Sequence, residues 1–423
     1  MRILKWIAIV ALGLMTLFVV GCSTLILPRV SAKPANYTAE PDLLGPINGR
    51  DAVRSLDDWE TDRAPFWLNI LLNEVYGSIP PHMDVRVTSE EILSSSLLDG
   101  KATLKAVKLQ FGESEPPIDL DLHVVIPNTP GPHPLILGAS FCPNHSALPF
   151  DGVEPPDAIY PGFCDGESWA TPIFKFIFGR HIASPPLQDI VDHGFAFGAY
   201  YPGQIVPDSE TSAPDALDSL PKGDMAHGPY AAIGVWAWAA TEIVDYVETD
   251  PDLDESRIIL FGHSRYGKSS LLAGVLDQRI AGVISHQSGT GGASLQKNDV
   301  GESIKSITKG YSHWFAPKYA TYAEKDMELS FDQHALVALM APRPLLLGNS
   351  TRDQWSDPKG AFASAEAAGE VYRLYGEAGF EAETLKDFDP DAKLAFEFRG
   401  GTHGITSHDW KYFLQWLDAQ FAN

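Results

Sequence analysis

The sequence RIILFGHSRYGKSS at residues 257–270 combines a short apolar run, a turn that contains two glycines and the start of a helix. The apolar run, residues 258–261, has the length and the β-branched residues of a buried parallel strand. Residues 268–276 then have the composition of a helix. A strand that enters a helix through a tight glycine turn is the context of a nucleophile elbow, which holds its serine in a strained conformation. The stretch therefore predicts an α/β fold with Ser264 as a candidate nucleophile.

Ser264 has a second interpretation, because a serine that precedes a helix is often an N-cap. The turn has the spacing G-x-S-x-x-G, which is one residue longer than the commoner G-x-S-x-G. A nucleophile needs a base beside it, and the base needs an acid that fixes its tautomer, whereas a cap needs neither. The choice between the two interpretations therefore depends on the residues that follow further along the chain.

His403 is the candidate base. In α/β-hydrolases the catalytic residues follow one another in the order serine, acid, histidine. The predicted last strand, residues 394–398, leads into the sequence RGGTHG, in which His403 lies in a glycine-rich turn. The nearest competitor is His408, but it lies where the closing helix is expected to start. The position after the last strand therefore favours His403.

Asp353 is the candidate acid, because it follows the preceding predicted strand, residues 344–347, within a few residues. Asp357 is the alternative in the same loop. It stands directly before a proline, which is typical of the N-cap of a following helix. The sequence therefore favours Asp353 as the acid and predicts a capping role for Asp357.

Arg265 is a candidate for stabilising the oxyanion of the reaction, because negative charge that develops on an ester oxygen needs hydrogen-bond donors aimed at it. Both the backbone N–H and the guanidinium of Arg265 are candidate donors. A cation in the first turn of a helix is disfavoured by the helix dipole, so the position favours a functional reason for the arginine. Residues 141–144 follow a predicted strand and are expected to contribute from the opposite side.

Residues 51–423 are expected to form a single catalytic domain. Strand-like runs at residues 84–139 predict an antiparallel opening, and beyond residue 140 strands alternate with helical patterns. Repeated β-α units predict a mostly parallel central sheet with helices on both faces. Two long irregular insertions, residues 141–186 and 202–229, interrupt the alternation, and sheets of this kind build substrate sites from such loops.

The N-terminal residues have a different composition. An apolar run behind two basic residues ends in the sequence VVGC at residues 19–22. This pattern predicts a secretory signal over residues 1–21 and resembles a bacterial lipobox, which implies a lipid on Cys22; a plain signal peptide or an uncleaved anchor is the alternative. Residues 22–50, polar and rich in proline, are expected to be a tether. We therefore expect an exported lipoprotein of the bacterial cell envelope, in the periplasm or at the cell surface.

The chain is strongly acidic, with 55 Asp and Glu against 31 Lys and Arg and a formal net charge of −24. Such a charge excludes broad binding to nucleic acids or other anionic polymers. We expect a monomer that contacts the membrane through its lipid only.

The chain has three cysteines, and if Cys22 carries the lipid, Cys142 and Cys164 remain. In an exported protein these two either pair or remain free thiols, and the sequence leaves both open.

The elbow sequence GHSRYGK at residues 262–268 resembles that of the glucuronoyl esterases, carbohydrate esterase family 15. The likeness extends along most of the mature chain through an ordered set of short motifs: WAW at 236–238, SGTGG at 288–292, HWF at 313–315, DQH at 332–334, APRP at 341–344 and DQW at 353–355. The elbow alone is moderately specific, whereas the ordered set is a strong signal. The resemblance implies an α/β-hydrolase fold.

The resemblance also implies a reaction: hydrolysis of the ester between (4-O-methyl-)glucuronic acid on xylan and an alcohol of lignin, without a metal or cofactor. Ser264, His403 and Arg265 match the nucleophile, the base and the oxyanion arginine of the family. Three further residues match substrate-binding positions. Lys268 matches a lysine that contacts the uronate, Trp355 matches a tryptophan that lines its site, and Glu302 is a further match across a variable segment whose alignment is not fixed.

Gln287 departs from the family pattern. Some members carry the catalytic acid as a glutamate at this position, and a glutamine side chain cannot ionise. The departure strengthens Asp353 and resembles the bacterial subgroup with the acid after the later strand. Two other functions remain open from the sequence: an acetyl- or feruloyl-type polysaccharide esterase with the same triad, and a lipoprotein that binds acidic sugars without turning them over.

Overall fold

The computed structural model describes residues 37–165, 178–297 and 300–422. The predicted signal, Cys22 and the first part of the predicted tether lie outside the described residues. Among the described helices, none is both long enough and apolar enough to cross a membrane.

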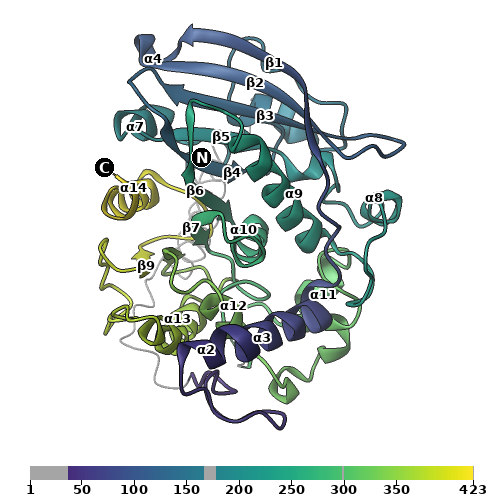
Figure 1. The fold of residues 1–423 in the computed structure, drawn as a ribbon, viewed down its shortest axis with the longest axis vertical. Coiled ribbons are helices and arrows are strands. Elements are labelled where there is room, and N and C mark those ends of the chain that lie inside the picture. Colours follow the sequence, from purple (N-terminus) through teal and green to yellow (C-terminus); the bar gives the residue numbers. More distant parts are fainter. Residues whose placement is uncertain (1–36, 166–177, 298–299, 423) are drawn as a thin grey trace, which may run out of the picture.

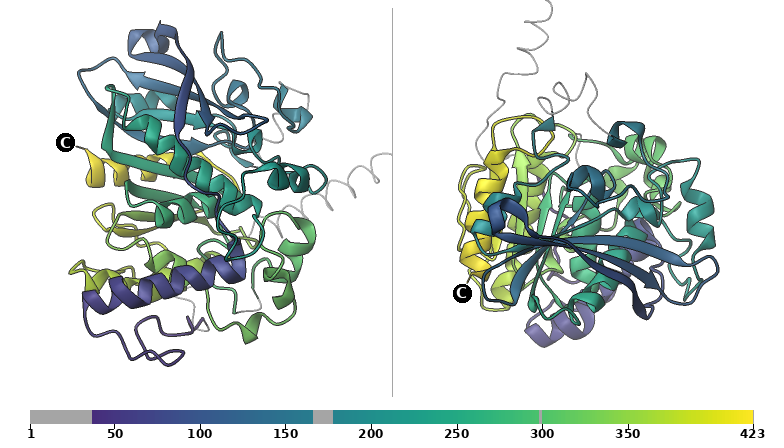
Figure 2. Two further views of the ribbon diagram at one scale, coloured as in Figure 1. Left: turned by 45° about the vertical axis from the view of Figure 1, so that its right-hand side comes forward. Right: turned by 90° about the horizontal axis from the view of Figure 1, so that it is seen from above.

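One nine-stranded sheet runs through the molecule (Figure 1), in the order β1-β2-β3-β5-β4-β6-β7-β8-β9. In chain order the strands are β1 (Val85–Ser96), β2 (Ala102–Phe111), β3 (Ile118–Pro127), β4 (His133–Ala139), β5 (Ala196–Tyr200), β6 (Leu253–His263), β7 (Ile280–His286), β8 (Leu345–Ser350) and β9 (Leu394–Arg399). The pairings β1–β2, β2–β3 and β3–β5 are antiparallel. From β5 through β4 to β9 every pairing is parallel. The strands fan out strongly when seen from above (Figure 2), as expected of a twisted sheet.

Helices cover both faces of the sheet, with α9 and α10 on one side and α14 on the other (Figure 1). The described helices are α2 (Leu56–Asp58), α3 (Ala64–Leu71), α4 (Leu97–Gly100), α5 (Asn144–Ala147), α7 (Leu187–Asp192), α8 (Ala213–Ser219), α9 (Ala232–Val247), α10 (Arg265–Leu276), α11 (Ile304–Gly310), α12 (His334–Ala338), α13 (Pro358–Leu374) and α14 (Ser407–Phe421). The predicted mostly parallel sheet with helices on both faces is therefore confirmed.

Two hydrophobic clusters hold these layers together, and successive strand residues alternate between them. In β6, Ile258 and Leu260 pack in the cluster with α9, α10, α12 and α13, whereas Ile259 packs in the cluster with α7 and α14. The other parallel strands alternate in the same way, because neighbouring side chains of a strand point to opposite faces. Strands that are buried on both faces explain the near-continuous apolar runs of the sequence.

The predicted elements differ from the structure mainly at their ends. Strand β1 extends to Ser96, well beyond the predicted end at residue 88. Its second half, SEEILSSS, is mostly exposed, and its two apolar residues, Ile92 and Leu93, are adjacent and do not alternate as in a strand. Pairing with β2 continues the strand through this part. The helix expected near residues 331–340 is confined to α12, and the helix expected at 66–76 is α3 followed by a π-helical turn.

A disulfide between Cys142 and Cys164 settles the question that the sequence left open. It closes a loop over a sequence separation of 22 residues in the first insertion. A crosslink of this length restricts the unfolded chain enough to stabilise the fold by about 3 kcal/mol.

The double variant Cys142→Ser/Cys164→Ser is therefore expected to unfold at a lower urea concentration than the wild type. An unchanged midpoint, with the wild type kept oxidised, would contradict the expectation.

Candidate active site

Ser264 lies in a strained turn between β6 and α10, with φ 56° and ψ −123°. A residue with a Cβ rarely adopts this conformation, and the cost is about 1–3 kcal/mol. Ser264 stands at the N-cap position of α10, but its side chain makes no capping hydrogen bond. Its backbone N–H donates to the carbonyl oxygen of His286 at 2.8 Å, which ties the turn to the neighbouring strand β7. The hydroxyl is therefore not used as a helix cap.

The two glycines of the elbow are required by close backbone contacts. A Cβ added to Gly262 would lie 2.0 Å from the carbonyl oxygen of Tyr266. At Gly267 it would lie 3.1 Å from the carbonyl oxygens of both Gly262 and His286. The glycines let β6, β7 and α10 approach closely, and this approach forces the serine between them into its conformation.

The strain at Ser264 gives a stability prediction. Ser264→Gly is expected to be more stable than Ser264→Ala by about 1 kcal/mol, because glycine adopts positive φ without a steric cost. Urea unfolding of the two variants measures the difference. Ser269, inside α10, provides the matched control, since Ser269→Gly should there be less stable than Ser269→Ala. The same order at both positions would mean that the elbow stores no strain.

His403 and Asp353 are joined by a hydrogen bond of 2.6 Å between His403 Nδ1 and Asp353 Oδ2. Asp353 is 2% exposed and also accepts hydrogen bonds from the backbone N–H (3.2 Å) and the hydroxyl of Ser356. Burial raises the pKa of Asp353. The hydrogen bond and the charge of His403, together with the two hydrogen bonds from Ser356, outweigh this effect, so the pKa is lowered overall. An ionised Asp353 holds the proton of His403 on Nδ1, which leaves Nε2 free to accept a proton.

The loop that carries His403 lies over the elbow. The ring centroid of His403 is 4.5 Å from that of His263, the residue directly before Ser264. The next residue, Gly404, donates its N–H to Oε1 of Gln287 at 2.7 Å. Gln287, which is 1% exposed and has φ 49°, thus holds the backbone of the histidine loop from the end of β7. The ends of the neighbouring strands β6, β7, β8 and β9 therefore converge on one place, as expected at the carboxyl edge of a parallel sheet.

The two competing residues of the sequence lie elsewhere. Asp357 stands at the N-cap position of α13, as predicted, although its side chain makes no capping bond there. Its Oδ1 accepts a hydrogen bond of 2.9 Å from the hydroxyl of Tyr37. His408 is at the start of α14 and its Nδ1 is 3.7 Å from Oε1 of Glu397. These partners, Tyr37 and Glu397, do not belong to the pair of His403 and Asp353.

The guanidinium of Arg265 lies among aromatic rings. Its central carbon is 4.9 Å from the ring centroid of Trp314, 5.2 Å from that of Phe141 and 5.9 Å from that of Tyr311. Phe141 comes from the segment 141–144 that was expected to face the elbow. Burial lowers the pKa of Arg265 from its ordinary value, but a guanidinium keeps its charge under all ordinary conditions. The cation is held in an apolar wall, where it acts more strongly than in water.

The three predicted substrate-binding residues lie close to one another near the elbow. Lys268 is 4% exposed and its Nζ donates to the carbonyl oxygens of Ser288 and Thr290. Burial lowers the pKa of Lys268 to about 8, against the opposing effect of Glu302. Burial likewise raises the pKa of Glu302, and Lys268 is the largest opposing charge.

Trp355 differs from these two residues because it is 64% exposed. Its ring centroid lies 6.0 Å from that of His403, in an edge-on arrangement. The backbone N–H of Glu302 donates to the carbonyl oxygen of Trp355 at 3.2 Å, which joins the two segments. An exposed aromatic face beside the candidate base is suited to stacking against a sugar ring.

A buried chain of histidines behind the site was not anticipated from the sequence. His263 Nδ1 is 3.0 Å from His286 Nδ1, and His286 Nε2 is 3.2 Å from Oδ1 of Asp409. Arg399 pairs with the same carboxylate at 2.6 Å. Burial, followed by the charges of His403, His286 and Arg399, lowers the pKa of His263 well below its ordinary value. His263 is therefore a neutral ring next to the candidate base. It stands in the elbow motif, but nothing in the sequence signals its contact with His286.

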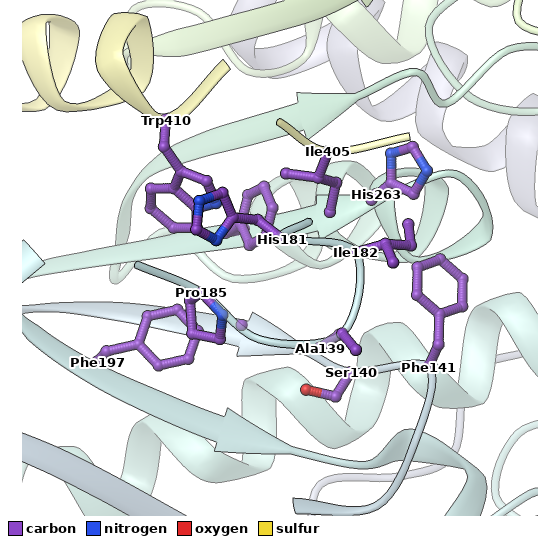
Figure 3. Close-up of a pocket in the computed structure, with 13 residues that line it drawn as sticks. Ala139, Ser140, Phe141, His181, Ile182, Pro185, Phe197, His263, Ile405 and Trp410 are labelled. Atoms are coloured by element: carbon purple, nitrogen blue, oxygen red, sulfur yellow. The ribbon is translucent and has the colours of Figure 1, made fainter. Parts of the chain in front are cut away.

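A small cavity lies beside His263 (Figure 3), with a volume of about 20 Å³. Its lining includes Ser140, Phe141, His181, Ile405 and Trp410. This volume holds about one water molecule and cannot admit a sugar. The cavity beside His263 is therefore a packing gap and not a sugar-binding site.

A family model described as fungal glucuronyl esterase matches residues 216–376. A carbohydrate esterase from an unknown prokaryotic organism is 30% identical over 416 residues, which are 92% of this chain and 94% of that protein. Among solved structures, a promiscuous esterase of family 15 from a marine bacterial metagenome is 29% identical with a TM-score of 0.80, over 93% of this chain and 98% of that one.

The glucuronoyl esterase from Solibacter usitatus is similar to the same extent. It is 31% identical, with a TM-score of 0.77, and the match covers 93% of this chain and 99% of that one. Together with the sheet order and the helices on both faces, these likenesses establish the α/β-hydrolase fold. A match at this level over nearly the whole of both chains shows the family, and the chain therefore belongs to the glucuronoyl esterases of carbohydrate esterase family 15 and is a carboxylic ester hydrolase.

Proposed function

We propose that this hydrolase cleaves the ester between the carboxyl group of (4-O-methyl-)glucuronic acid on xylan and an alcohol of lignin. The observation that carries the proposal is the hydrogen bond of 2.6 Å between His403 Nδ1 and Asp353 Oδ2, beside a serine in a strained elbow. Membership of the glucuronoyl esterase family supports the ester class. Xylan, the 4-O-methyl group and lignin are the part of the proposal that goes beyond the family.

The first half of the proposed reaction forms an acyl-enzyme. Ser264 Oγ attacks the ester carbonyl while Nε2 of His403 takes its proton, and Asp353 stabilises the imidazolium that results. Negative charge then develops on the carbonyl oxygen. Arg265, held in its aromatic wall, supplies a positive charge and N–H donors to that oxygen.

The imidazolium of His403 gives its proton to the leaving alcohol as the tetrahedral intermediate collapses, which completes the acyl-enzyme. In the second half, water attacks the acyl group on Ser264 while His403 accepts the proton of that water. His403 then returns this proton to Ser264 Oγ as the second tetrahedral intermediate collapses and the sugar acid leaves. The products are the alcohol and a glucuronate, and Ser264 returns to its hydroxyl form. Every step uses side chains of this chain and one water molecule.

Three residues are proposed to hold the sugar. Lys268 and Glu302 supply charged hydrogen-bonding groups for its hydroxyls, and Trp355 supplies an aromatic face. Their burial differs, because Lys268 is 4% exposed and Trp355 is 64% exposed. We therefore expect Lys268 to fix the sugar inside the site and Trp355 to cover it from the solvent side.

The cellular setting is a separate proposal. The lipobox-like sequence before Cys22 supports an exported lipoprotein with an acylated Cys22 in the bacterial cell envelope. The disulfide between Cys142 and Cys164 is consistent with an oxidising compartment. We propose that a monomer acts there, tethered by its lipid. Metabolic labelling with an alkyne fatty acid, compared between the wild type and Cys22→Ala, tests the acylation.

Kinetics on two substrates test the proposed reaction. The enzyme is expected to release methanol from methyl glucuronate, or benzyl alcohol from benzyl glucuronate, faster than it releases acetate from acetylated xylan. Release of acetate alone would replace the proposal with an acetyl-type polysaccharide esterase. Binding of the uronate oligosaccharide without turnover of any ester would replace it with a sugar-binding lipoprotein.

A further inference from the structure

Arg265 has an ion-pair partner that no motif of the sequence suggested. Its Nη1 pairs with Oδ2 of Asp208, a residue of the second long insertion. The side chain of Asp208 is 16% exposed and that of Arg265 is 25% exposed, so both are largely removed from solvent. The insertion thus contacts the guanidinium of the residue that directly follows Ser264.

The other oxygen of Asp208 is occupied by neutral donors. Trp314 Nε1 donates to Oδ1 at 2.7 Å, and His313 Nε2 lies 2.9 Å from the same oxygen. Burial lowers the pKa of His313 to about 4, so its ring is neutral near pH 7 and its Nε2 must carry a proton to donate to a carboxylate. The two hydrogen bonds from neutral donors fix the orientation of the carboxylate, and Arg265 is the cation that pairs with its negative charge.

We propose that Asp208 is a positioning residue, which holds the guanidinium of Arg265 in the orientation that stabilises the oxyanion. This inference rests on the proposed function, in which Arg265 supports the oxyanion. The carboxylate takes one end of the planar guanidinium and leaves its other N–H groups for the reacting oxygen.

The aromatic wall does not fix Arg265 in this way. Tyr311 and Trp314 stack on each other with ring centroids 3.8 Å apart and an interplanar angle of 6°, and Phe141 lies on the same cation. Ring faces attract a cation without a strong preference for its rotation. Arginine has several flexible torsions, and an oxyanion donor that is not held in place must be ordered during the reaction. Asp208 removes this freedom before the substrate arrives.

Asp208→Asn is the variant that tests the proposal. It keeps the volume and the oxygen that accepts from Trp314, but it removes the charge that orients Arg265. We expect kcat on methyl glucuronate to fall by about 10- to 100-fold with KM within about threefold, since one oxyanion donor contributes about 10²–10³ to kcat. The rate at which a fluorophosphonate modifies Ser264 should fall in parallel, and this readout does not depend on the sugar.

Glu210→Gln is the matched control. Glu210 lies two residues further along the same insertion, and its Oε1 accepts from the N–H and the hydroxyl of Ser312, both at 3.3 Å. The change removes the same charge from the same loop without touching Arg265. We expect both rates to stay within about twofold of the wild type.

A double-mutant cycle with Arg265→Met separates positioning from a general effect on the fold. In the Arg265→Met background, Asp208→Asn should change both rates by less than about twofold. An equal loss with and without Arg265, or a loss no larger than that of Glu210→Gln, overturns the proposal. If Asp208→Asn does not fold, Asp208→Glu decides, because it keeps the charge and shifts it by one methylene group; wild-type rates there also overturn the proposal.

The two readouts distinguish this proposal from the proposed function. In one outcome the wild type does not hydrolyse glucuronate esters, but the fluorophosphonate modifies Ser264 more slowly in Asp208→Asn than in the wild type. This outcome rules out the proposed substrate and supports the positioning role. Turnover of glucuronate esters by the wild type, with both rates unaffected by Asp208→Asn, retains the substrate and removes the positioning role.

Discussion

Ser264→Ala is expected to lower kcat on methyl glucuronate by about 10⁶-fold, the loss found when the serine of a triad is removed. The change deletes the only atom that forms the acyl bond, and the backbone of the elbow stays as it is because alanine also carries a Cβ. The structure gives the hydroxyl no other duty, since it does not cap α10. Single-turnover kinetics with an enzyme concentration above that of the substrate measure the loss.

A second serine of α10 serves as the control for Ser264. Ser269 is 1% exposed and its hydroxyl donates to the carbonyl oxygen of Tyr266 at 3.1 Å, so its role is structural. Ser269→Ala makes the same chemical change five residues away and should keep kcat within about threefold. Turnover by Ser264→Ala above about one thousandth of the wild-type rate would mean that another group performs the attack.

Asp353→Asn has the second largest expected effect, a fall in kcat of about 10⁴-fold. An asparagine amide at this position donates to Nδ1 of His403 and so forces the proton onto Nε2. That nitrogen then cannot take the proton of Ser264, although the geometry is kept. Asp357→Asn, in the same loop, is the control. Its side chain bonds to Tyr37, and its kcat should stay within a few-fold of the wild type.

Gln287 occupies the position at which some family members carry the catalytic acid, and it allows a test of whether a carboxylate there can replace Asp353. In the Asp353→Asn background, Gln287→Glu supplies a carboxylate at the end of β7. Its oxygen already accepts from the N–H of Gly404 at 2.7 Å, so the structure predicts a gain of less than about tenfold. A full return of kcat would show that either strand can carry the acid, and that Asp353 is not the sole source of the correct tautomer.

The sequence located the elements that follow strong local rules. Ser264, Asp353 and His403 each follow an apolar strand and lie next to a glycine, a proline or a polar turn, so chain order and strand ends were enough to propose them. The buried strands were equally visible, because they are apolar on both faces. Each of these signals is local, because the strand and the turn that mark a residue lie within a few residues of it. Such a signal does not depend on long-range contacts in the fold.

Asp208 and His286 could not be found in this way. Asp208 lies in an irregular insertion, where one acidic residue among many carries no spacing signal, and its role depends on a contact with Arg265 across the fold. His286 is the last residue of a buried strand, and only the sheet order brings it next to His263. Strand β1 was underestimated for the same reason, since its polar second half is held by a partner strand.

The order of the sheet also has a consequence for how the protein is made. The candidate nucleophile, acid and base follow β6, β8 and β9, which lie in the sheet in the order in which they are synthesised. A chain that has emerged only as far as the end of β9 already holds Ser264 and Asp353, yet it lacks His403. Because parallel strands pair only after long connections have closed, the last strand is also a late contact in folding. Catalytic competence should therefore be acquired at the final step, which keeps an incomplete chain free of esterase activity.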